Sequence, residues 1–392
     1  MAIKHIQTHH PKFLTAAILV SGFFLGMSTA LVTYINSSFL ETFVSARWVG
    51  AVFSIAYVGS LLAIQNYGRG IAKFGNSWLL YANILLQMLA YLTLAKAHAP
   101  AVLIVAFITF ILTTTTTILN YDVYLKELAP VNKTGRLRGM FWTVVNLGFL
   151  VSPMITGALV ELGGYRVVYF TSAIVLIPAL LLMYAAFNGD RYRIPYRPHE
   201  PLAITLRRAW ANRNMRGILA IAFALYFFYA WMVIYTPIYL LQAGFDWVDI
   251  GKMFTVMLLP FVLVEYPAGY IADKYIGETE LLMIGFGIMA ISLFALLTVS
   301  SFAGVMIVLL CSRIGASLVE IMRETYFYKK VRSGDLDMME TFRNMNPVAH
   351  IIAPATATVL LAFGAHVPTL FLILGLGMAF AAAIPSTMKD SR

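Results

Sequence analysis

The sequence predicts an all-α membrane protein with twelve transmembrane helices, arranged as two pseudo-symmetric bundles of six. The composition, the apolar segments and the positions of the basic residues support this fold class. Of the 392 residues, 60% are hydrophobic and only 12% are charged, whereas soluble domains are about 45–50% apolar and about 25% charged. A soluble protein of this size has too little interior to bury so much apolar surface, so lipid is its expected solvent.

Apolar segments follow one another along the whole chain, each long enough to cross about 30 Å of hydrocarbon at about 1.5 Å per residue. Lipid offers no partner for backbone N–H and C=O groups, so these segments must be helices. We expect the first to be retained, since it is longer than the apolar core of a signal peptide. The predicted spans are about 13–35, 48–66, 77–95, 101–125, 140–161, 167–187, 217–241, 248–271, 280–299, 304–328, 343–364 and 367–386.

The basic residues alternate between the two ends of these spans. If the N-terminus is cytoplasmic, 22 of the 28 lysines and arginines fall in segments that face the cytoplasm, which is the bias that sets membrane topology. The net charge of +10 therefore reflects topology and not nucleic-acid binding. We expect both termini on the cytoplasmic side of a bacterial-type inner or plasma membrane.

One long connection, residues 188–216, divides the chain into an N-terminal six-helix bundle, 1–187, and a C-terminal one, 217–392. It contains three prolines, followed by a segment, 202–215, in which apolar and basic residues alternate. Such a segment is typical of a helix that lies on an anionic membrane surface.

The two bundles repeat each other with a shift of about 200 residues. A constant shift across four helices indicates an internal duplication. Phe39-Leu40 matches Tyr239-Leu240, Val49-Gly50 matches Ile250-Gly251, Phe53 matches Phe254, Asp122-Val123-Tyr124 matches Glu324-Thr325-Tyr326, and Pro153 matches Pro354.

The duplicated segments after the second and eighth spans carry a recognisable motif. Gly269-Tyr270-Ile271-Ala272-Asp273-Lys274, followed by Gly277, resembles the glycine-x-leucine-alanine-aspartate-arginine signature of the major facilitator superfamily. The first copy, from Gly68 to Gly75, keeps the glycines but has Ala72 where the family has aspartate. The resemblance implies a transporter whose small-molecule substrate binds between the two halves, near the bilayer midplane.

The resemblance also implies where the protein opens and closes. By the family pattern, Asp273 pairs with the start of the fifth span, around Arg136 to Arg138, when the cytoplasmic side is closed. Ala72 leaves the symmetric contact, near Arg343, without its acid. Glu265, close to the second motif, could support this gate or carry a proton. The residues assigned to the gating loops are Gly68, Arg69, Lys73, Gly75, Gly269, Asp273 and Lys274.

Ionisable residues inside a span are costly, at about 2.5–3.5 kcal/mol each on insertion scales, and so indicate function. The tenth span has four: Arg313, Glu320, Arg323 and Glu324. Arg313 and Glu320 share a face about 10.5 Å apart along the helix, which leaves room for a substrate group or water. Glu320 and Glu324 would share a proton, opposed by Arg323. The alternative is a cluster at the helix end that fixes Glu324 near Lys329.

Other spans add polar and aromatic candidates. Asn120 and Asp122 lie in the fourth span, where a salt bridge from Asp122 to Lys126 is the plainer interpretation. In the seventh span, one aromatic stripe suits flat, amphipathic or cationic substrates, although simple packing explains it equally well. The stripe consists of Phe228, Trp231 or Met232, and Tyr235, and on the eleventh span Asn344, Asn346 and His350 add hydrogen-bonding groups.

The fifth span, from Asn146 to Gly157, is similar to the glycine–proline–glycine pattern of proton-driven exporters. In that pattern small residues allow close helix packing and a proline permits a bend. Ser152 and Thr156 stand where the pattern has glycines. This resemblance favours efflux.

The sequence contains no phosphate-binding loop of the G-x-x-x-x-G-K-[ST] type, so ATP-driven transport by this chain is excluded. We expect a monomeric, proton-coupled antiporter that exports small organic molecules and needs no cofactor or metal. Facilitated or proton-symport uptake of a metabolite is the alternative within this class. A membrane enzyme or a transport-inactive sensor is the alternative outside it, but an enzyme would need a nucleophile with a base, or paired metal ligands. Of the histidines, only His350 lies well inside a span.

Overall fold

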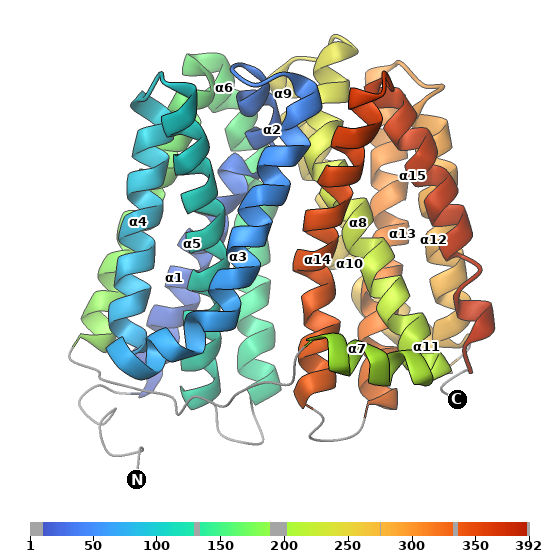
Figure 1. Ribbon diagram of the computed structural model, residues 1–392, viewed down its shortest axis with the longest axis horizontal. Coiled ribbons are helices and arrows are strands. Elements are labelled where there is room, and N and C mark those ends of the chain that lie inside the picture. Colours follow the sequence, from blue (N-terminus) through green and yellow to red (C-terminus); the bar gives the residue numbers. More distant parts are fainter. Residues whose placement is uncertain (1–10, 129–133, 189–201, 275, 332–335, 390–392) are drawn as a thin grey trace. The chain divides into compact units, whose positions relative to one another are not determined.

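The computed structural model describes residues 11–128, 134–188, 202–274, 276–331 and 336–389, and these are helical almost throughout. They form two compact units (Figure 1). The first unit contains residues 1–44 and 55–197, and the second contains 45–54 and 198–392. The division at Arg197 and Pro198 falls inside the predicted connection, and the first residues of the second predicted span group with the second unit.

The helices of the first unit follow the predicted spans closely. A short additional helix, α2, follows the first span, and Gly164 interrupts the long helix α6 with a φ of +72°, a conformation that favours glycine. The helices are α1 (Pro11–Thr33), α2 (Asn36–Glu41), α3 (Ala46–Phe74), which begins in the second unit, α4 (Asn76–Lys96), α5 (Pro100–Leu128) and α6 (Thr134–Phe187).

Most of the predicted surface segment forms α7, which belongs to the second unit and packs against α8 and α14. The helices of this unit are α7 (Leu202–Ala211), α8 (Arg213–Gln242), α9 (Trp247–Leu258), α10 (Pro260–Leu263), α11 (Glu265–Lys274), α12 (Glu278–Leu296), α13 (Phe302–Lys330), α14 (Leu336–Ala362), α15 (Val367–Ala381) and the 3-10 turn η1 (Pro385–Thr387).

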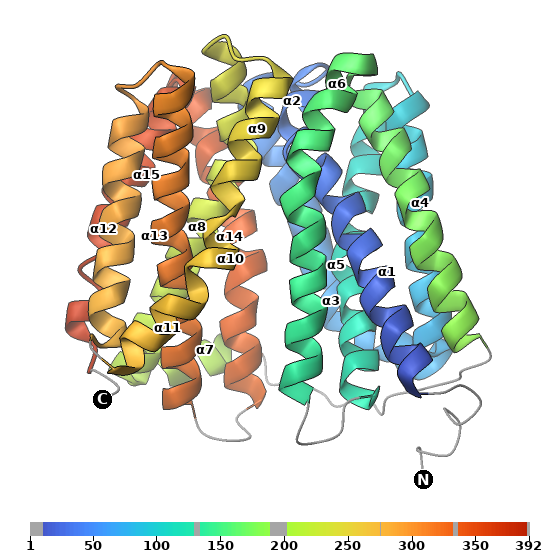
Figure 2. The same ribbon diagram turned by 180° about the vertical axis from the view of Figure 1, so that it is seen from behind.

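Within the described residues, ten helices are long and apolar enough to cross a membrane. One of them, α6, covers both the fifth and the sixth predicted spans and turns between them at Gly163 and Gly164. The eighth predicted span is not one helix but three, α9, α10 and α11 (Figure 2). Pro260 begins α10, and a proline cannot donate the backbone hydrogen bond that would continue the preceding helix. The total of twelve spans stays a prediction.

Helices α1 and α6 pack closely in the first unit. A Cβ atom placed on Gly148 would lie 2.6 Å from the backbone nitrogen of Met27, so only glycine fits there. Two hydroxyls of α6 bond to carbonyls of α1: Ser152 to Met27 at 3.3 Å and Thr156 to Leu31 at 2.8 Å. The small residues of the fifth predicted span therefore allow close helix packing, as the sequence indicated.

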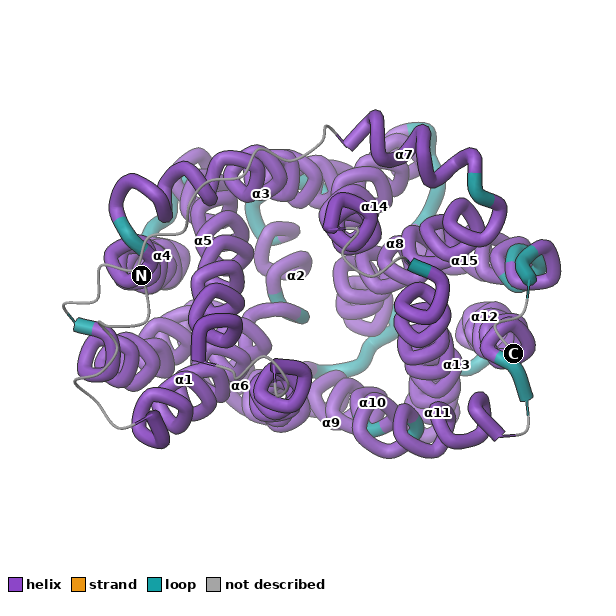
Figure 3. Tube along the Cα trace, turned by 90° about the horizontal axis from the view of Figure 1, so that it is seen from below, coloured by secondary structure: helices purple, strands orange, loops and turns teal. Residues whose placement is uncertain are grey.

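Helix α13 is the centre of the second unit. Viewed along the helices, it lies among α8, α12 and the series α9 to α11 (Figure 3). Its closest approach is to α12, where two glycines face each other: a Cβ on Gly315 would lie 2.5 Å from the carbonyl oxygen of Gly285. The charged residues of the tenth predicted span are therefore held on a helix that packs against α8, α12 and the series α9 to α11.

Replacing Gly315 with alanine is expected to lower the thermal unfolding temperature of the purified protein. The added methyl group would push α12 and α13 apart, and overpacking of this kind costs about 1–3 kcal/mol. Gly287→Ala is the matched control, because a Cβ there meets no atom within 4 Å and alanine favours the helix. Equal unfolding temperatures for the two variants would contradict the close α12–α13 contact.

Candidate functional site

A buried arginine, Arg323, organises a cluster of charged and aromatic side chains in the second unit. Only 1% of its surface is exposed. Its Nη2 donates to the hydroxyl of Tyr226 at 2.9 Å and lies 3.4 Å from Glu324 and 3.9 Å from Glu320. The guanidinium also stacks over the rings of Tyr226 and Phe342, at 4.3 and 5.5 Å. The i, i+3 and i+4 spacing on α13 and the facing helix α8 together create this arrangement.

Tyr229 of α8 connects the two residues that the sequence placed on one face of the tenth span. Its hydroxyl donates to Glu320 at 2.6 Å, and its ring lies 5.6 Å from the guanidinium carbon of Arg313. Arg313 is only 2% exposed and also lies over Phe228, at 5.2 Å. The space expected between Arg313 and Glu320 for substrate or water therefore contains Tyr229. Tyr229 lies off the predicted aromatic stripe of Phe228, Trp231 and Tyr235, so the sequence did not single it out.

The cluster is electrostatically balanced and incompletely hydrogen-bonded. Its two arginines, Arg313 and Arg323, and its two glutamates, Glu320 and Glu324, carry no net formal charge when all four are ionised. The Nε and Nη1 atoms of Arg323 are buried and have no hydrogen-bond partner within the described part of the chain. Buried donors are almost always satisfied, so these two groups of Arg323 are available to a polar partner.

The proposed contact between Glu324 and Lys329 is wrong. Lys329 donates instead to the buried carboxylate of Glu278, at the start of α12. A buried carboxylate requires a counter-charge, and α12 brings Glu278 to the end of α13 where Lys329 lies. Glu324 lies beside the buried Arg323, which it shares with Glu320, and also interacts electrostatically with Arg343 of α14.

The aromatic stripe of the seventh predicted span is packed inside the second unit. Phe228, Trp231 and Tyr235 are all buried, and the indole N–H of Trp231 donates to the carbonyl of Ala353 on α14. The Nδ1 atom of His350 lies 3.0 Å from the Asn346 carbonyl, one helical turn away. The packing interpretation accounts for these contacts, and a role in binding substrate stays a prediction.

Asn120 belongs to a buried network in the first unit that the sequence did not reveal. Its amide donates to the Asn76 side chain at 2.7 Å, and its own oxygen accepts from the Tyr67 hydroxyl at 2.7 Å. Asn83 donates to the same hydroxyl. The network joins α3, α4 and α5 through neutral groups, and a role of Asn120 in the substrate or proton pathway stays a prediction.

Asp122 also pairs differently from the expectation. It accepts from Arg138 of α6 at 2.6 Å, and not from Lys126, because α6 begins beside the end of α5. Both side chains are partly exposed, and such pairs contribute about 0–1 kcal/mol. Asn146, further along α6, is exposed.

The two copies of the loop motif lie at helix ends and not in loops. Gly68, Arg69 and Lys73 belong to the last turns of α3, while Gly75, with a φ of +89°, separates α3 from α4. Gly269, Asp273 and Lys274 belong to α11. The side chains of Glu265 and Asp273 lie outside the described part of the structure, so their gating and proton-carrying roles stay predictions.

Two surface cavities lie away from the charged cluster, both in the first unit. A groove of about 440 Å³ lies between α4 and α5. A pocket of about 400 Å³ is lined by Phe39, Thr42, Phe43, His98, Leu103, Gly163, Gly164, Tyr165 and Arg166. Within the described residues, no group of three or more histidine, cysteine, aspartate or glutamate side chains could hold a metal ion. The buried charged cluster therefore remains the candidate site.

Comparison with known families and proteins gives a consistent result. Residues 14–334 match the family described as the Major Facilitator Superfamily. An uncharacterised MFS-type transporter of Methanocaldococcus jannaschii is 23% identical over 200 residues, which are 50% of this chain and 51% of that protein. The chain thus spans about half the length of the curated relative that it matches.

Solved structures of similar fold are transporters of the POT family. One, in complex with 5-aminolevulinic acid, has a TM-score of 0.77 at 14% identity and covers 99% of this chain and 100% of its own. Another, PepTSo, has a TM-score of 0.75 at 13% identity, with 96% and 97% covered. A third, in complex with a thioalcohol-conjugated peptide, has a TM-score of 0.72 at 15% identity, with 96% of each chain covered. At these identities the likeness is one of fold.

Proposed function

Because the chain belongs to the Major Facilitator Superfamily, we propose that it couples the movement of a small organic molecule to protons, through the charged cluster of α8 and α13. As a member of this family, the protein is a multi-pass membrane transporter and not an enzyme. The coupling ion, the cargo and the direction are our proposals.

The observation that carries the proposal is the arrangement of Glu320. This carboxylate lies inside a candidate membrane span, accepts from Tyr229 and lies 3.9 Å from Arg323. The Glu320 side chain is 34% exposed, so it can exchange a proton with water while it faces the buried Arg323. Glu320 is therefore suited to bind and release a proton as the cargo arrives and leaves.

The charge balance favours a cargo with an anionic group. The two arginines of the cluster are buried, and within the described residues the Nε and Nη1 atoms of Arg323 have no hydrogen-bond partner. An anion bound beside them would add a negative charge to a neutral cluster, and proton uptake by Glu320 would restore neutrality. Tyr229 links the two events, because it touches both Arg313 and Glu320. An anion and a proton would then travel together, which is symport.

Proton-driven efflux is a second candidate, supported by a different observation. Gly148, Ser152 and Thr156 of α6 bring it against α1 in the manner of the exporter-like pattern. Efflux requires the opposite coupling, in which cargo and proton compete for the cluster. A cationic cargo would compete in this way for Glu320.

Transport by the purified protein in liposomes that contain a pH-sensitive dye tests these proposals. The panel should contain organic anions, zwitterions, amphipathic cations and sugars. We expect an anionic or zwitterionic compound to drive proton movement in its own direction. Proton movement opposite to that of a cation would support efflux, and transport without any proton movement would overturn proton coupling.

Replacing Arg313 with glutamine is expected to raise the cargo concentration for half-maximal uptake about thirtyfold or more, since removing one partner of a buried charged contact costs about 2–5 kcal/mol. Uptake of the labelled cargo over a concentration series measures this. Lys252→Gln is the control, because Lys252 is an exposed cation paired with Asp249. An unchanged half-maximal concentration in the Arg313 variant would remove Arg313 from the binding site.

A further inference from the structure

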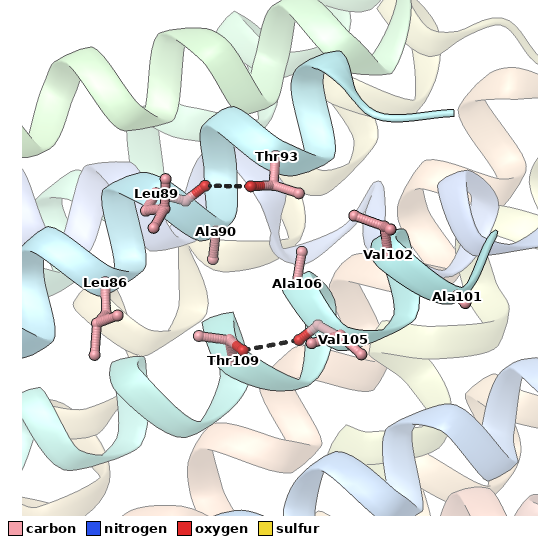
Figure 4. Close-up of a pocket in the computed structure, with 9 residues that line it drawn as sticks. All are labelled: Leu86, Leu89, Ala90, Thr93, Ala101, Val102, Val105, Ala106 and Thr109. Atoms are coloured by element: carbon pink, nitrogen blue, oxygen red, sulfur yellow. Dashed lines mark hydrogen bonds between the residues drawn. The ribbon is translucent and has the colours of Figure 1, made fainter. Parts of the chain in front are cut away.

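The groove between α4 and α5 is apolar and carries no free hydrogen-bonding group. Its two hydroxyls, of Thr93 and Thr109, donate to the carbonyls of Leu89 and Val105 one turn earlier, each at 2.8 Å (Figure 4). Hydroxyls bonded in this way offer nothing to a polar ligand. The groove is lined by Leu86, Leu89, Ala90, Thr93, Ala101, Val102, Val105, Ala106 and Thr109.

Both helices are candidate membrane spans, and the groove opens on their exposed side. Leu89 and Val105, which line it, are 60% and 64% exposed. Large apolar side chains exposed on a membrane-spanning helix face hydrocarbon. The occupant of the groove therefore comes from the bilayer and is apolar.

The direction and length of the groove match one acyl chain. The groove follows α4 from residue 86 to 93 and α5 from 101 to 109, which is about 12 Å along the helix axes at about 1.5 Å per residue. This is less than half of the roughly 30 Å of hydrocarbon in a bilayer. The occupant thus belongs to one leaflet, at the end where α4 ends and α5 begins.

Cations lie at the water-facing end of the groove. Lys96, the last residue of α4, is seven residues after Leu89 and so continues the same helical face. Arg166, which lines the second pocket, donates to the carbonyl of Ala97, the next residue, at 3.0 Å and lies 3.1 Å from Nδ1 of His98. Within the described residues, neither Lys96 nor Arg166 forms an ion pair with a carboxylate. An apolar groove that ends at two cations is complementary to an anionic lipid.

We propose that this groove is a binding site for an anionic phospholipid, with one acyl chain between α4 and α5 and the phosphate group beside Lys96 and Arg166. The lipid covers apolar side chains of both helices and so joins two helices of the first unit. This site is separate from the charged cluster of the second unit, and the proposal does not depend on the transport mechanism.

Native mass spectrometry of the detergent-purified full chain, with phosphatidylglycerol and phosphatidylcholine added at equal concentrations, tests the proposal. We expect wild type to retain phosphatidylglycerol about fivefold or more over phosphatidylcholine, since each cation near the headgroup contributes about 1 kcal/mol. Lys96→Gln should reduce this preference about fivefold. Equal retention of the two lipids by wild type would overturn the proposed preference for an anionic headgroup.

Val105→Trp tests the groove itself, because the indole would fill it from its exposed side. Leu89→Trp fills it from the other helix, in case the first variant does not fold. Both should lose the retained phosphatidylglycerol. The control is Leu181→Trp, on α6, where the leucine is 60% exposed and lies outside the groove. Retention by the two groove variants equal to that of the control would show that lipid binds elsewhere or only as annular lipid, and the proposal would fail.

Discussion

Glu320→Gln is expected to abolish proton-driven accumulation of cargo and to leave exchange of cargo across the membrane in place. Glutamine keeps the shape of the side chain and can still accept from Tyr229, but it cannot bind and release a proton. Uptake driven by an imposed pH gradient should fall to the level of protein-free liposomes. Exchange of labelled for unlabelled cargo, without a gradient, should continue, because it requires no net proton transfer.

Two further carboxylates make this test specific. Glu161→Gln, at an exposed position of α6 just before its turn at Gly163 and Gly164, should leave gradient-driven uptake at the wild-type rate. Glu324→Gln removes the second carboxylate beside Arg323, so its effect reports how far the pair shares the proton. Wild-type accumulation by the Glu320 variant would remove Glu320 from the proton pathway, and loss of exchange together with accumulation would show a binding defect instead.

Arg323→Met is expected to cause the largest loss of stability of any single substitution in the cluster. Methionine preserves much of the apolar stem, so the main change is the loss of the cation that two carboxylates share. Glu320 and Glu324, 34% and 37% exposed, would lose the buried cation that they share, and because solvent screens them the expected cost lies below the about 3–5 kcal/mol of a fully buried pair. Thermal unfolding followed by a fluorescent thiol- or tryptophan-based readout in detergent measures the effect.

The first unit supplies the matched control for this prediction. Arg138→Met also breaks an arginine–carboxylate pair, but Arg138 and Asp122 are both partly exposed, and such pairs contribute about 0–1 kcal/mol. Adding Glu320→Gln to Arg323→Met should restore part of the lost stability, since it removes one of the uncompensated charges. Equal unfolding temperatures for Arg323→Met and Arg138→Met would contradict the central role of Arg323.

The sequence was informative about which residues lie inside the membrane. Composition and the lengths of the apolar segments were sufficient for the fold class, and the motif after the eighth span for the family, which the match over residues 14–334 confirms. The sequence also selected α13, because four ionisable residues in one apolar span have no other simple explanation. The structure places three of them, Glu320, Arg323 and Glu324, within one ion-pair network.

The sequence was not informative about which side chains on different helices contact each other. It paired Asp122 with Lys126 and Glu324 with Lys329, both within one helix, whereas the structure pairs Asp122 with Arg138 and Lys329 with Glu278. It also predicted an open space between Arg313 and Glu320, where Tyr229 lies, and it gave no sign of the hydrogen-bond network around Asn120. In each case the partner comes from another helix.

The physical reason is that helical periodicity fixes which side chains of one helix share a face, but not which helix that face meets. By itself, the sequence therefore determined that lipid surrounds this protein, that its fold is helical and which helix carries the buried charges. The neighbour of each face depends on close contacts such as those at Gly148 and Gly315, where the absence of a side chain lets two backbones approach. Only the tertiary structure decided that α8 lies against α13 with Tyr229 between Arg313 and Glu320.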